Sequence, residues 1–433
     1  MRSWKKYPKY KDSGVEWLGE IPDGWLLKRI KLASPITNKK IDRVNQDLQY
    51  IALENIESWT GKYKQSIGEI QPESMVNIFC ENNVIFGKLR PYLAKVYQTN
   101  NDGVCSSEFF VLKPKDLTPE YLFDFLLNRE FIDIINSSTY GAKMPRANWD
   151  FFGNQMISIP SLPEQTAIAS FLDRETTRID ALIEKKQRQI ELLQEKRAAL
   201  ISQAVTKGLD PTVPMKDSGV PWLGEVPEHW RVIHLKRISP QITVGIVITP
   251  SKYYVDEGVP CLRSLNIKEN YILNEDLVYI SEESNLLHSK SKIYKGDLVS
   301  VRTGQTGTTT VVNENFNGCN CIDLIIIRKS NDFDSDYLSY VLNSDLAKTK
   351  YSLESAGSIQ SHFNIEMASN MIIPLPPLEE QILIRKYIVT KAQNIEKTYR
   401  KISESISLIQ EYRSTLISAA VTGKIDVRDE ATA

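Results

Sequence analysis

Few residues in this chain have the types and the spacing that catalysis or metal binding requires. Cys319 and Cys321 stand two positions apart and could supply two thiolate ligands to one metal ion. The same spacing also places two side chains on one face of a β-strand. The four histidines have no ligand spacing with these cysteines, and they are His229, His234, His288 and His362. We therefore expect no metal site.

The segment from Val301 to Gly307 reads VRTGQTG, and its glycines first suggest a phosphate-binding loop. It lacks the Gly-Lys-[Ser/Thr] ending whose lysine and hydroxyl contact phosphates and magnesium. A tight turn between two strands explains the glycines better. The chain also contains no Asn-Pro-Pro-[Phe/Tyr] tetrapeptide and no serine or cysteine nucleophile motif. The sequence therefore predicts a protein that is not itself an enzyme.

The elements that position any site are written twice. Residues 12–25 read DSGVEWLGEIPDGW and residues 217–230 read DSGVPWLGEVPEHW, with ten identities in fourteen positions. A second echo follows each copy, ISQAVTKGLD at residues 201–210 and ISAAVTGKID at residues 417–426. The chain is therefore one unit of roughly 200 residues in two copies, and we expect two similar but diverged sites.

Composition is that of a globular chain. The 433 residues suggest two to four domains, and 42% hydrophobic and 25% charged residues are ordinary values. There is no signal-peptide pattern and no apolar run long enough for a membrane span. Five mostly isolated cysteines suit a reducing cytoplasm. A net charge of −1 means that any nucleic-acid binding must come from local basic clusters or be shared with a partner.

Each copy predicts short strands followed by helical pieces and a proline-bearing breaker. Strands are expected where residues that favour them gather, at 84–86, 109–112, 298–302 and 324–327. Helical pieces are expected at 121–127 and 337–342. The breakers, at 159–163 and 373–377, mark a helix boundary just beyond them. This order predicts two mixed α/β globular regions.

A long heptad pattern follows each breaker, over about 40 residues without proline or glycine. In the first copy its seam positions are Leu172, Thr176, Ile179, Ile183, Lys186, Ile190, Leu193, Arg197, Leu200 and Ala204. In the second they are Ile388, Ala392, Ile395, Tyr399, Ile402, Ile406, Ile409, Arg413, Leu416 and Ala420. Such spacing is typical of coiled-coil helices, here about 60 Å long at 1.5 Å per residue.

Neither helix can leave such a stripe exposed, so each needs a partner. The connectivity favours an antiparallel pair within the chain, because the second globular region begins just after the first helix ends. The fold class predicted is α+β: two mixed α/β regions at opposite ends of an antiparallel two-helix coiled coil, with a pseudo-twofold internal duplication. The alternative is a homodimer of parallel helices.

Three repeated motifs resemble the specificity subunits of type I restriction–modification enzymes. They are the W-L-G-E-[IV]-P-x-x-W segment, the helix starts at residues 162–165 (LPEQ) and 378–381 (LEEQ), and the closing L-I-S-x-A-V-T. Further stretches look like the same family, at residues 103–112, 144–149 and 296–302. The resemblance spans essentially the whole chain and includes its duplicated order of head and helix.

The resemblance implies a DNA-recognition subunit without chemistry or cofactors of its own. Each head would be a target recognition domain that reads one half of a split double-stranded DNA sequence. The helices would set the gap and dock two adenine-N6 methyltransferase subunits, and two motor–nuclease subunits would complete the complex. S-adenosylmethionine, ATP and Mg²⁺ would belong to those partners, in the cytoplasm and with no membrane. The alternatives are a non-enzymatic assembly scaffold with two diverged binding heads, and a fused methyltransferase–nuclease, which the missing catalytic motifs disfavour.

The domain boundaries expected on this basis follow the repeat. They are target recognition domain 1 at 1–160, the central coiled-coil helix at 161–206, a linker at 207–216, target recognition domain 2 at 217–375, the distal coiled-coil helix at 376–422 and a C-terminal tail at 423–433.

Base edges are read by Arg, Lys, Asn, Gln, Ser and Thr side chains, so polar, turn-rich stretches of the heads are the DNA-binding candidates. In head one they are Lys88, Arg90, Tyr92, Lys143, Arg146 and Asn148. In head two they are Arg302, Thr303, Gln305, Thr306, Ser358, Gln360, Ser361, His362 and Asn364. The matching stretches differ in side chain, as two heads that read different half-sites would. The alternative for each basic residue is a solvated loop charge.

Other repeated residues are expected to be scaffold. Trp17, Trp25, Trp222 and Trp230 recur in both copies, whereas residues that read different sequences should diverge. We therefore expect them to pack each head against its helices. Arg197 and Arg413 are unusual on an apolar seam, because a buried unpaired charge costs several kcal/mol. They are expected to pair with acids across the helices or with a partner subunit.

Overall fold

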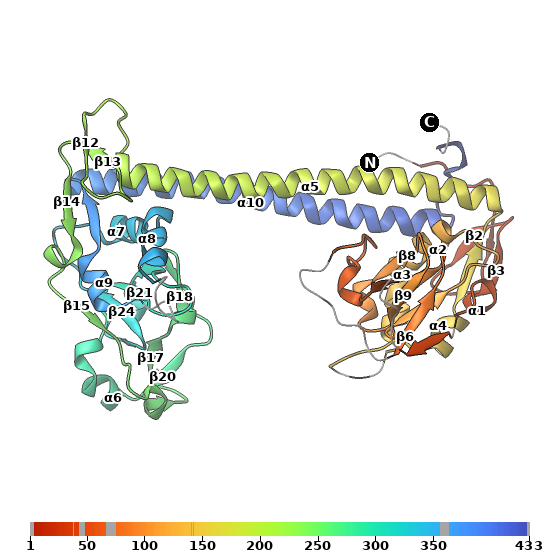
Figure 1. The fold of residues 1–433 in the computed structure, drawn as a ribbon, viewed down its shortest axis with the longest axis horizontal. Coiled ribbons are helices and arrows are strands. Elements are labelled where there is room, and N and C mark those ends of the chain that lie inside the picture. Colours follow the sequence, from red (N-terminus) through yellow and green to blue (C-terminus); the bar gives the residue numbers. More distant parts are fainter. Residues whose placement is uncertain are drawn as a thin grey trace. The chain divides into compact units, whose positions relative to one another are not determined.

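The chain forms two compact units, each with a globular head and part of both long helices (Figure 1). The computed structural model describes residues 4–37, 39–42, 48–65, 75–139, 141, 143–355 and 363–430. Unit 1 comprises Met1–Gln187 and Ser403–Ala433, and unit 2 comprises Arg188–Ile402. The long helices are α5 (Leu162–Lys207) and α10 (Leu378–Val421). Head one is the part of unit 1 before α5, and head two is the part of unit 2 between α5 and α10.

Head one is built from small antiparallel sheets with one parallel pair. Its sheets are β1 (Tyr10–Asp12) with β2 (Glu20–Pro22); β3 (Leu26–Arg29) with β11 (Met156–Ile159); β10 (Phe109–Leu112), β7 (Val84–Gly87) and β8 (Val96–Gln98); and β4 (Lys40–Asp42), β6 (Met75–Phe79), β9 (Gly103–Ser106) and β5 (Gln49–Ile51), where β5 and β9 are parallel. Its helices are α1 (Ile30–Ala33), α2 (Pro119–Leu126), α3 (Arg129–Ser137) and α4 (Trp149–Asn154), with 3₁₀ turns η1 (Leu53–Asn55) and η2 (Pro91–Leu93).

Head two repeats this plan with additions. Its sheets are β12 (Met215–Asp217) with β13 (Glu225–Pro227); β14 (Arg231–His234) with β25 (Ile372–Leu375); β15 (Ile242–Val244), β24 (Leu324–Ile327), β21 (Leu298–Val301) and β22 (Thr309–Val311); β16 (Tyr254–Val255), β20 (Val278–Ile280), β17 (Val259–Leu262) and β23 (Asn320–Cys321); and β18 (Ile267–Lys268) with β19 (Tyr271–Ile272). Its helices are α6 (Glu282–Leu287), α7 (Ser335–Asn343), α8 (Asp345–Ser355) and α9 (Ile365–Asn370). The remaining 3₁₀ turns are η3 (Leu235–Arg237), η4 (Pro250–Tyr253), η5 (Ser264–Asn266), η6 (Ser289–Ser291) and η7 (Glu314–Phe316) in head two, and η8 (Arg428–Glu430) in unit 1.

The two long helices run antiparallel within the chain, as predicted. In unit 1 the first turns of α5, with Phe171 and Leu172, share a core with Leu416 and Val421 at the end of α10. In unit 2 the end of α5 shares a core with the first turns of α10. All ten seam positions of α5 are buried or half-buried, and in α10 only Tyr399, 36% exposed, is not. The heptad pattern therefore identified the face that the helices bury.

Repeated side chains fasten each head to both helices. The hydroxyl of Tyr121 in α2 donates to the carbonyl oxygens of Ser158 (2.9 Å) and Val421 (3.0 Å). At the equivalent place in unit 2, Tyr337 donates to the carbonyl oxygens of Pro374 (3.1 Å) and Val205 (3.3 Å). Both tyrosines are fully buried. The same joint between head, breaker and helix end is therefore built twice.

The repeated tryptophans and the glutamine of each helix start belong to this joint. Trp25 and Trp230 are each 1% exposed, and they belong to the core of their own unit. The side-chain oxygen of buried Gln165 accepts from the backbone N of Thr118 (2.8 Å), and its amide donates to the carbonyl of Pro160 (3.1 Å). Trp17 and Trp222 are half-buried against the same cores. The expectation that the repeated tryptophans pack each head against its helices is confirmed.

Arg413 pairs with an acid across the helices, as expected, whereas Arg197 does not. The Nε of Arg413, 9% exposed, lies 3.0 Å from Oδ1 of Asp180 in α5, and its Nη1 donates to the carbonyl of Trp59 (2.9 Å). Arg197 is half-buried, and no residue that the structure describes forms an ion pair with it. An ion pair therefore joins the two helices in unit 1, and the equivalent arginine of unit 2 forms none with the described residues.

Among the described residues, no helix is both long enough and apolar enough to cross a membrane.

Candidate nucleic-acid interface

In each head a backbone hydrogen bond joins the described parts of the two segments predicted to contact DNA, and in head two the second segment is described only at residues 363–364. In head one the backbone N of Ala147 donates to the carbonyl of Lys88 (2.9 Å), and the N of Arg90 donates to the carbonyl of Pro145 (2.8 Å). In head two the N of Phe363 donates to the carbonyl of Arg302 (2.9 Å). Ala147 and Phe363 hold equivalent positions in the two copies, 216 residues apart. The duplication therefore builds this pair of joined segments twice. We call each pair a platform: residues 88–92 with 143–148 in head one, and residues 302–306 with 363–364 in head two.

Head one presents a basic surface on this platform. Lys88 follows β7, is half-buried, and lies with its ammonium 5.6 Å from the ring centroid of Phe110. Burial lowers the pKa of Lys88 from its ordinary value, while the nearby carboxylate of Glu108 opposes that shift. Arg90 is exposed at the start of η2, in the left-handed region at φ 52°, and Tyr92 is 43% exposed. Arg90 and Tyr92 can therefore reach a ligand from this turn.

The second segment of head one combines a held arginine with a helix cap. Arg146 is half-buried and forms two hydrogen bonds with the carboxylate of Glu108. Lys143 is exposed. The side-chain oxygen of Asn148 accepts from the backbone N of Asp150 (2.7 Å) and so caps α4. Asn148 therefore has a structural role, and its side-chain amide group stays at the surface.

The described part of head two offers different side chains at the equivalent place. Arg302 pairs with the carboxylate of Asp323, Thr303 and Gln305 are exposed, and Thr306 is half-buried. Asn364 caps α9 by accepting from the backbone N of Met367 (2.8 Å), as Asn148 caps α4. Four candidates lie outside the described residues: Ser358, Gln360, Ser361 and His362.

The glycine-rich segment of head two is a strand connection, as predicted. It joins β21 to β22, and the backbone N of Gly307 donates to the carbonyl of Val301 (2.9 Å). Gly307 has φ +81°, and a Cβ there would come within 2.4 Å of the Tyr351 ring. Only glycine fits this turn. The turn therefore presents Gln305 at the surface without the lysine that a phosphate loop needs.

Two acidic residues of the platform were missed by sequence reasoning. Glu108 and Asp323 each stand one residue before an equivalent strand, β10 and β24, and each holds an arginine. Glu108 binds Arg146 from the second segment of head one, whereas Asp323 binds Arg302 from the first segment of head two. The recurrence of an acid 215 residues apart was the available signal.

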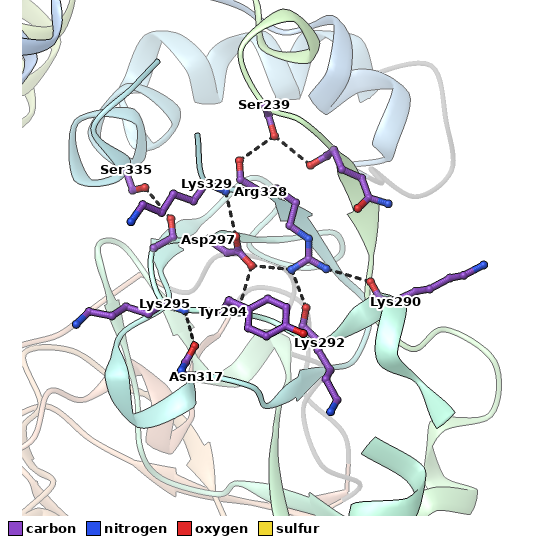
Figure 2. A network of polar contacts seen from close by, with 12 residues as sticks. Ser239, Lys290, Lys292, Tyr294, Lys295, Asp297, Asn317, Arg328, Lys329 and Ser335 are labelled. Carbon is purple, nitrogen blue, oxygen red and sulfur yellow. Dashed lines mark hydrogen bonds and ion pairs between the residues drawn. The ribbon is translucent and has the colours of Figure 1, made fainter. Parts of the chain in front are cut away.

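The far end of β21 carries a structural network instead (Figure 2). Asp297, which precedes the strand, is buried and accepts from Nη1 of Arg328 (2.6 Å) and from the backbone N of Lys329 (3.0 Å). The guanidinium also donates to the carbonyls of Lys292 and Lys290. A buried ion pair is tolerated when its remaining donors are satisfied in this way. Asp297 therefore fixes the strand whose other end presents Arg302.

The cysteines of the Cys-Asn-Cys segment are core residues. Cys319 and Cys321 are buried, and burial raises the pKa of both thiols. Within the described part of the chain, no three His, Cys, Asp or Glu residues are placed to hold a metal ion.

Comparisons with known proteins point to one family. The family model described as "Type I restriction modification DNA specificity domain" matches residues 27–192 and 227–406. The chain is 26% identical to the type I restriction enzyme MjaVIII specificity subunit of Methanocaldococcus jannaschii over 76% of this chain and 75% of that protein. It is 30% identical to the EcoDI specificity subunit of Escherichia coli over 35% of this chain and 34% of that protein.

Solved structures share the fold. A chain from a structural study of complex assembly and conformational transition in a type I restriction–modification system superposes with a TM-score of 0.71 at 19% identity, covering 93% of this chain and 98% of that one. The HsdS subunit of Thermoanaerobacter tengcongensis gives a TM-score of 0.50 at 20% identity, covering 94% and 98%.

Proposed function

The chain belongs to the family of type I restriction–modification DNA specificity subunits, and we propose that each of its heads reads one half of a bipartite DNA target. The observation that carries this proposal is the platform built twice, with the same backbone pairing under different side chains. Two heads that bound the same partner would keep those side chains alike. Two half-sites of different sequence require them to differ.

The side chains of the platform suit groove contacts. Arginine and lysine donate to the acceptor edge of guanine, and glutamine and asparagine suit adenine. Head one offers Lys88, Arg90 and Arg146, whereas the described part of head two offers Arg302 and Gln305. Phosphate contacts position the protein without reading sequence, and here the near-neutral chain would share them with its partners.

The long helices are proposed to set the gap between half-sites and to dock two adenine-N6 methyltransferase subunits. Large apolar side chains stay exposed along both helices and offer packing surface to a partner, namely Leu182 and Leu192 of α5 and Leu383 and Leu408 of α10. On this proposal the chain performs no chemistry. S-adenosylmethionine would be bound by the methyltransferases, and ATP and Mg²⁺ would be bound by two motor–nuclease subunits where these are present.

Competition binding separates this function from an assembly scaffold. The chain is co-purified with its methyltransferase, and the affinity for a duplex carrying the target is measured against an excess of duplex with both half-sites scrambled. The proposal expects at least a ~10³-fold preference for the target at physiological salt, as specific DNA binders show. Equal affinity for the two duplexes would support the scaffold instead.

A further inference from the structure

Unit 1 contains an acidic cleft that no part of the proposed DNA platform uses. It lies between α2 and the first turns of α5, has a volume of about 410 Å³, and is lined by three carboxylates, those of Glu120, Asp124 and Asp173. The other lining residues are uncharged: Gln98, Phe123, Thr166, Ala169, Ser170 and Thr176. The cleft therefore has carboxylates on its walls, and none of the residues that line it is a cation.

Asp124 distinguishes the cleft from a patch of exposed acids, because it is buried and is unpaired within the described part of the chain. Asp124 is 8% exposed and lines the cleft, and its side chain has no hydrogen-bond or ion-pair partner among the described residues. A buried carboxylate without a partner is costly, and burial accordingly raises the pKa of Asp124 well above its ordinary value. A cation placed in the cleft would supply the missing partner.

Unit 2 shows which cation fits, because its chain supplies one at the equivalent place. Arg385 of α10 lies 216 positions after Ala169, and its Nη1 is 3.1 Å from Asp336 Oδ2 and 3.4 Å from Asp334 Oδ2. Asp336 is the counterpart of Glu120 in the first copy. Unit 1 keeps the acid but has the small Ala169 where unit 2 has the guanidinium.

Two further positions of the cleft differ in charge between the units. Position 340 in unit 2 is an uncharged tyrosine where unit 1 has Asp124, and Val389 stands where unit 1 has Asp173. Unit 1 therefore has acids at these two positions, has Thr118 where unit 2 has Asp334, and lacks the arginine. No three acids of the described chain are placed to share a metal ion, and a planar guanidinium can instead contact carboxylates that lie apart.

We propose that the acidic cleft of unit 1 binds an arginine side chain of the methyltransferase subunit. The methyltransferase is the partner that fits, because α5 forms one wall of the cleft and is a docking helix of the proposed function. The inference rests on that function for the identity of the partner alone. The charge complementarity belongs to the cleft itself.

A graft of the unit 2 arginine into unit 1 tests the cleft directly. Ala169→Arg in the full chain is expected to raise Tm, and the rise is expected to disappear in an Asp124→Asn, Glu120→Gln background. The same Ala169→Arg change should weaken the complex with the purified methyltransferase by about tenfold or more, because the partner's arginine is displaced. A Tm change that is independent of Asp124, or unchanged affinity for the methyltransferase, overturns the proposal.

A second variant keeps the test decisive if the graft does not fold. Asp124→Asn with Asp173→Asn should weaken the complex by about tenfold or more, with a reduced dependence on salt. Asp336→Asn is the matched control, since its charge is already met by Arg385, and it should change the affinity less than twofold. Wild-type affinity for the double variant overturns the inference. So does a MgCl₂-dependent rise in Tm that Asp124→Asn abolishes, because the cleft would then hold a divalent ion.

Methylation by the wild-type complex distinguishes a failure of the proposed function from a failure of the cleft proposal. If it methylates no bipartite sequence, the proposed function fails. If it does so and the variants assemble like wild type, only the cleft proposal fails.

Discussion

The guanidinium of Arg146 and the carboxylate of Glu108 are joined by two hydrogen bonds, 3.1 Å from Nε to Oε2 and 3.2 Å from Nη2 to Oε1. The pair links the second segment of head one to the turn before β10. In head two the turn before β24 holds Arg302 through Asp323. A carboxylate therefore orients one arginine in each proposed DNA platform, although the arginine comes from a different segment.

Glu108→Gln is expected to relax recognition at one position of the first half-site. The substitution keeps the shape of the side chain but removes the charge that orients Arg146, so about 1–3 kcal/mol of discrimination at one base pair is lost. Relative methylation rates on a set of single-base variants of the target measure this. Asp323→Asn is the counterpart and should affect the second half-site alone. A change in the same half-site from both variants contradicts the assignment.

Gln165→Ala should destabilise unit 1 by about 1–3 kcal/mol, since it removes a buried side chain and leaves the half-buried backbone N–H of Thr118 without its acceptor. Gln381→Ala should do the same in unit 2, where the backbone N of Asp334 loses its acceptor. Chemical denaturation followed by circular dichroism measures both. Gln187→Ala, at an exposed position of α5, is the control and should stay within about 0.5 kcal/mol of wild type. Equal stability of all three variants would show that the helix starts are not anchored in this way.

Asp124→Asn should flatten the pH dependence of stability. The folded-state pKa of Asp124 is raised, mainly by burial and further by Asp173 and Glu120, while Arg413 opposes the shift. The protonated carboxyl therefore contributes fully below its unfolded pKa, near 3.8, and that contribution is lost as pH rises through the folded pKa. Asparagine cannot ionise, so the variant should gain stability over wild type as pH increases from 4. Parallel curves of unfolding free energy against pH would mean that Asp124 ionises freely in the folded chain.

Removing one heptad from each helix should shorten the gap in the target and leave both half-sites unchanged. Suitable deletions lie between Thr177 and Arg197 in α5 and between residues 393 and 413 in α10. Seven residues of helix span about 10.5 Å, or roughly three base pairs of DNA. Mapping of methylated adenines measures the gap. Altered half-site letters with an unchanged gap would show that the helices are not the spacer.

The sequence predicted more of the fold than of the candidate site. The heptad seam of α5 and α10, the expected strands and the scaffold role of Trp25 and Trp230 follow from periodicity and repetition, which depend on local spacing. The pairing of Arg413 with Asp180 followed from the cost of an unpaired charge on the seam. Arg197 is the exception, because it holds the equivalent position in α5 but forms no ion pair with any described residue.

The candidate site could be located but not resolved into roles. The segments of Lys88 and Arg146 were found as polar and turn-rich, yet their adjacency depends on a bridge between distant residues. Asn148 was a candidate reader, and its helix cap appears only once α4 is in place. Glu108 was not predicted because acids are not expected where DNA binds, and the acidic cleft was not predicted because its lining comes from segments that are distant in the sequence. The DNA-contact assignments and the domain boundaries stay predictions.

The central claim is that one chain reads two half-sites, and mapping methylated adenines tests it most directly. The chain and its methyltransferase are expressed together in a host that lacks other adenine methylation, and every N6-methyladenine is located by sequencing. The account predicts one motif of two specific parts with an unspecified gap of fixed length, in which head-one variants alter only one part. A contiguous motif, or head-one variants that alter both parts, would contradict it.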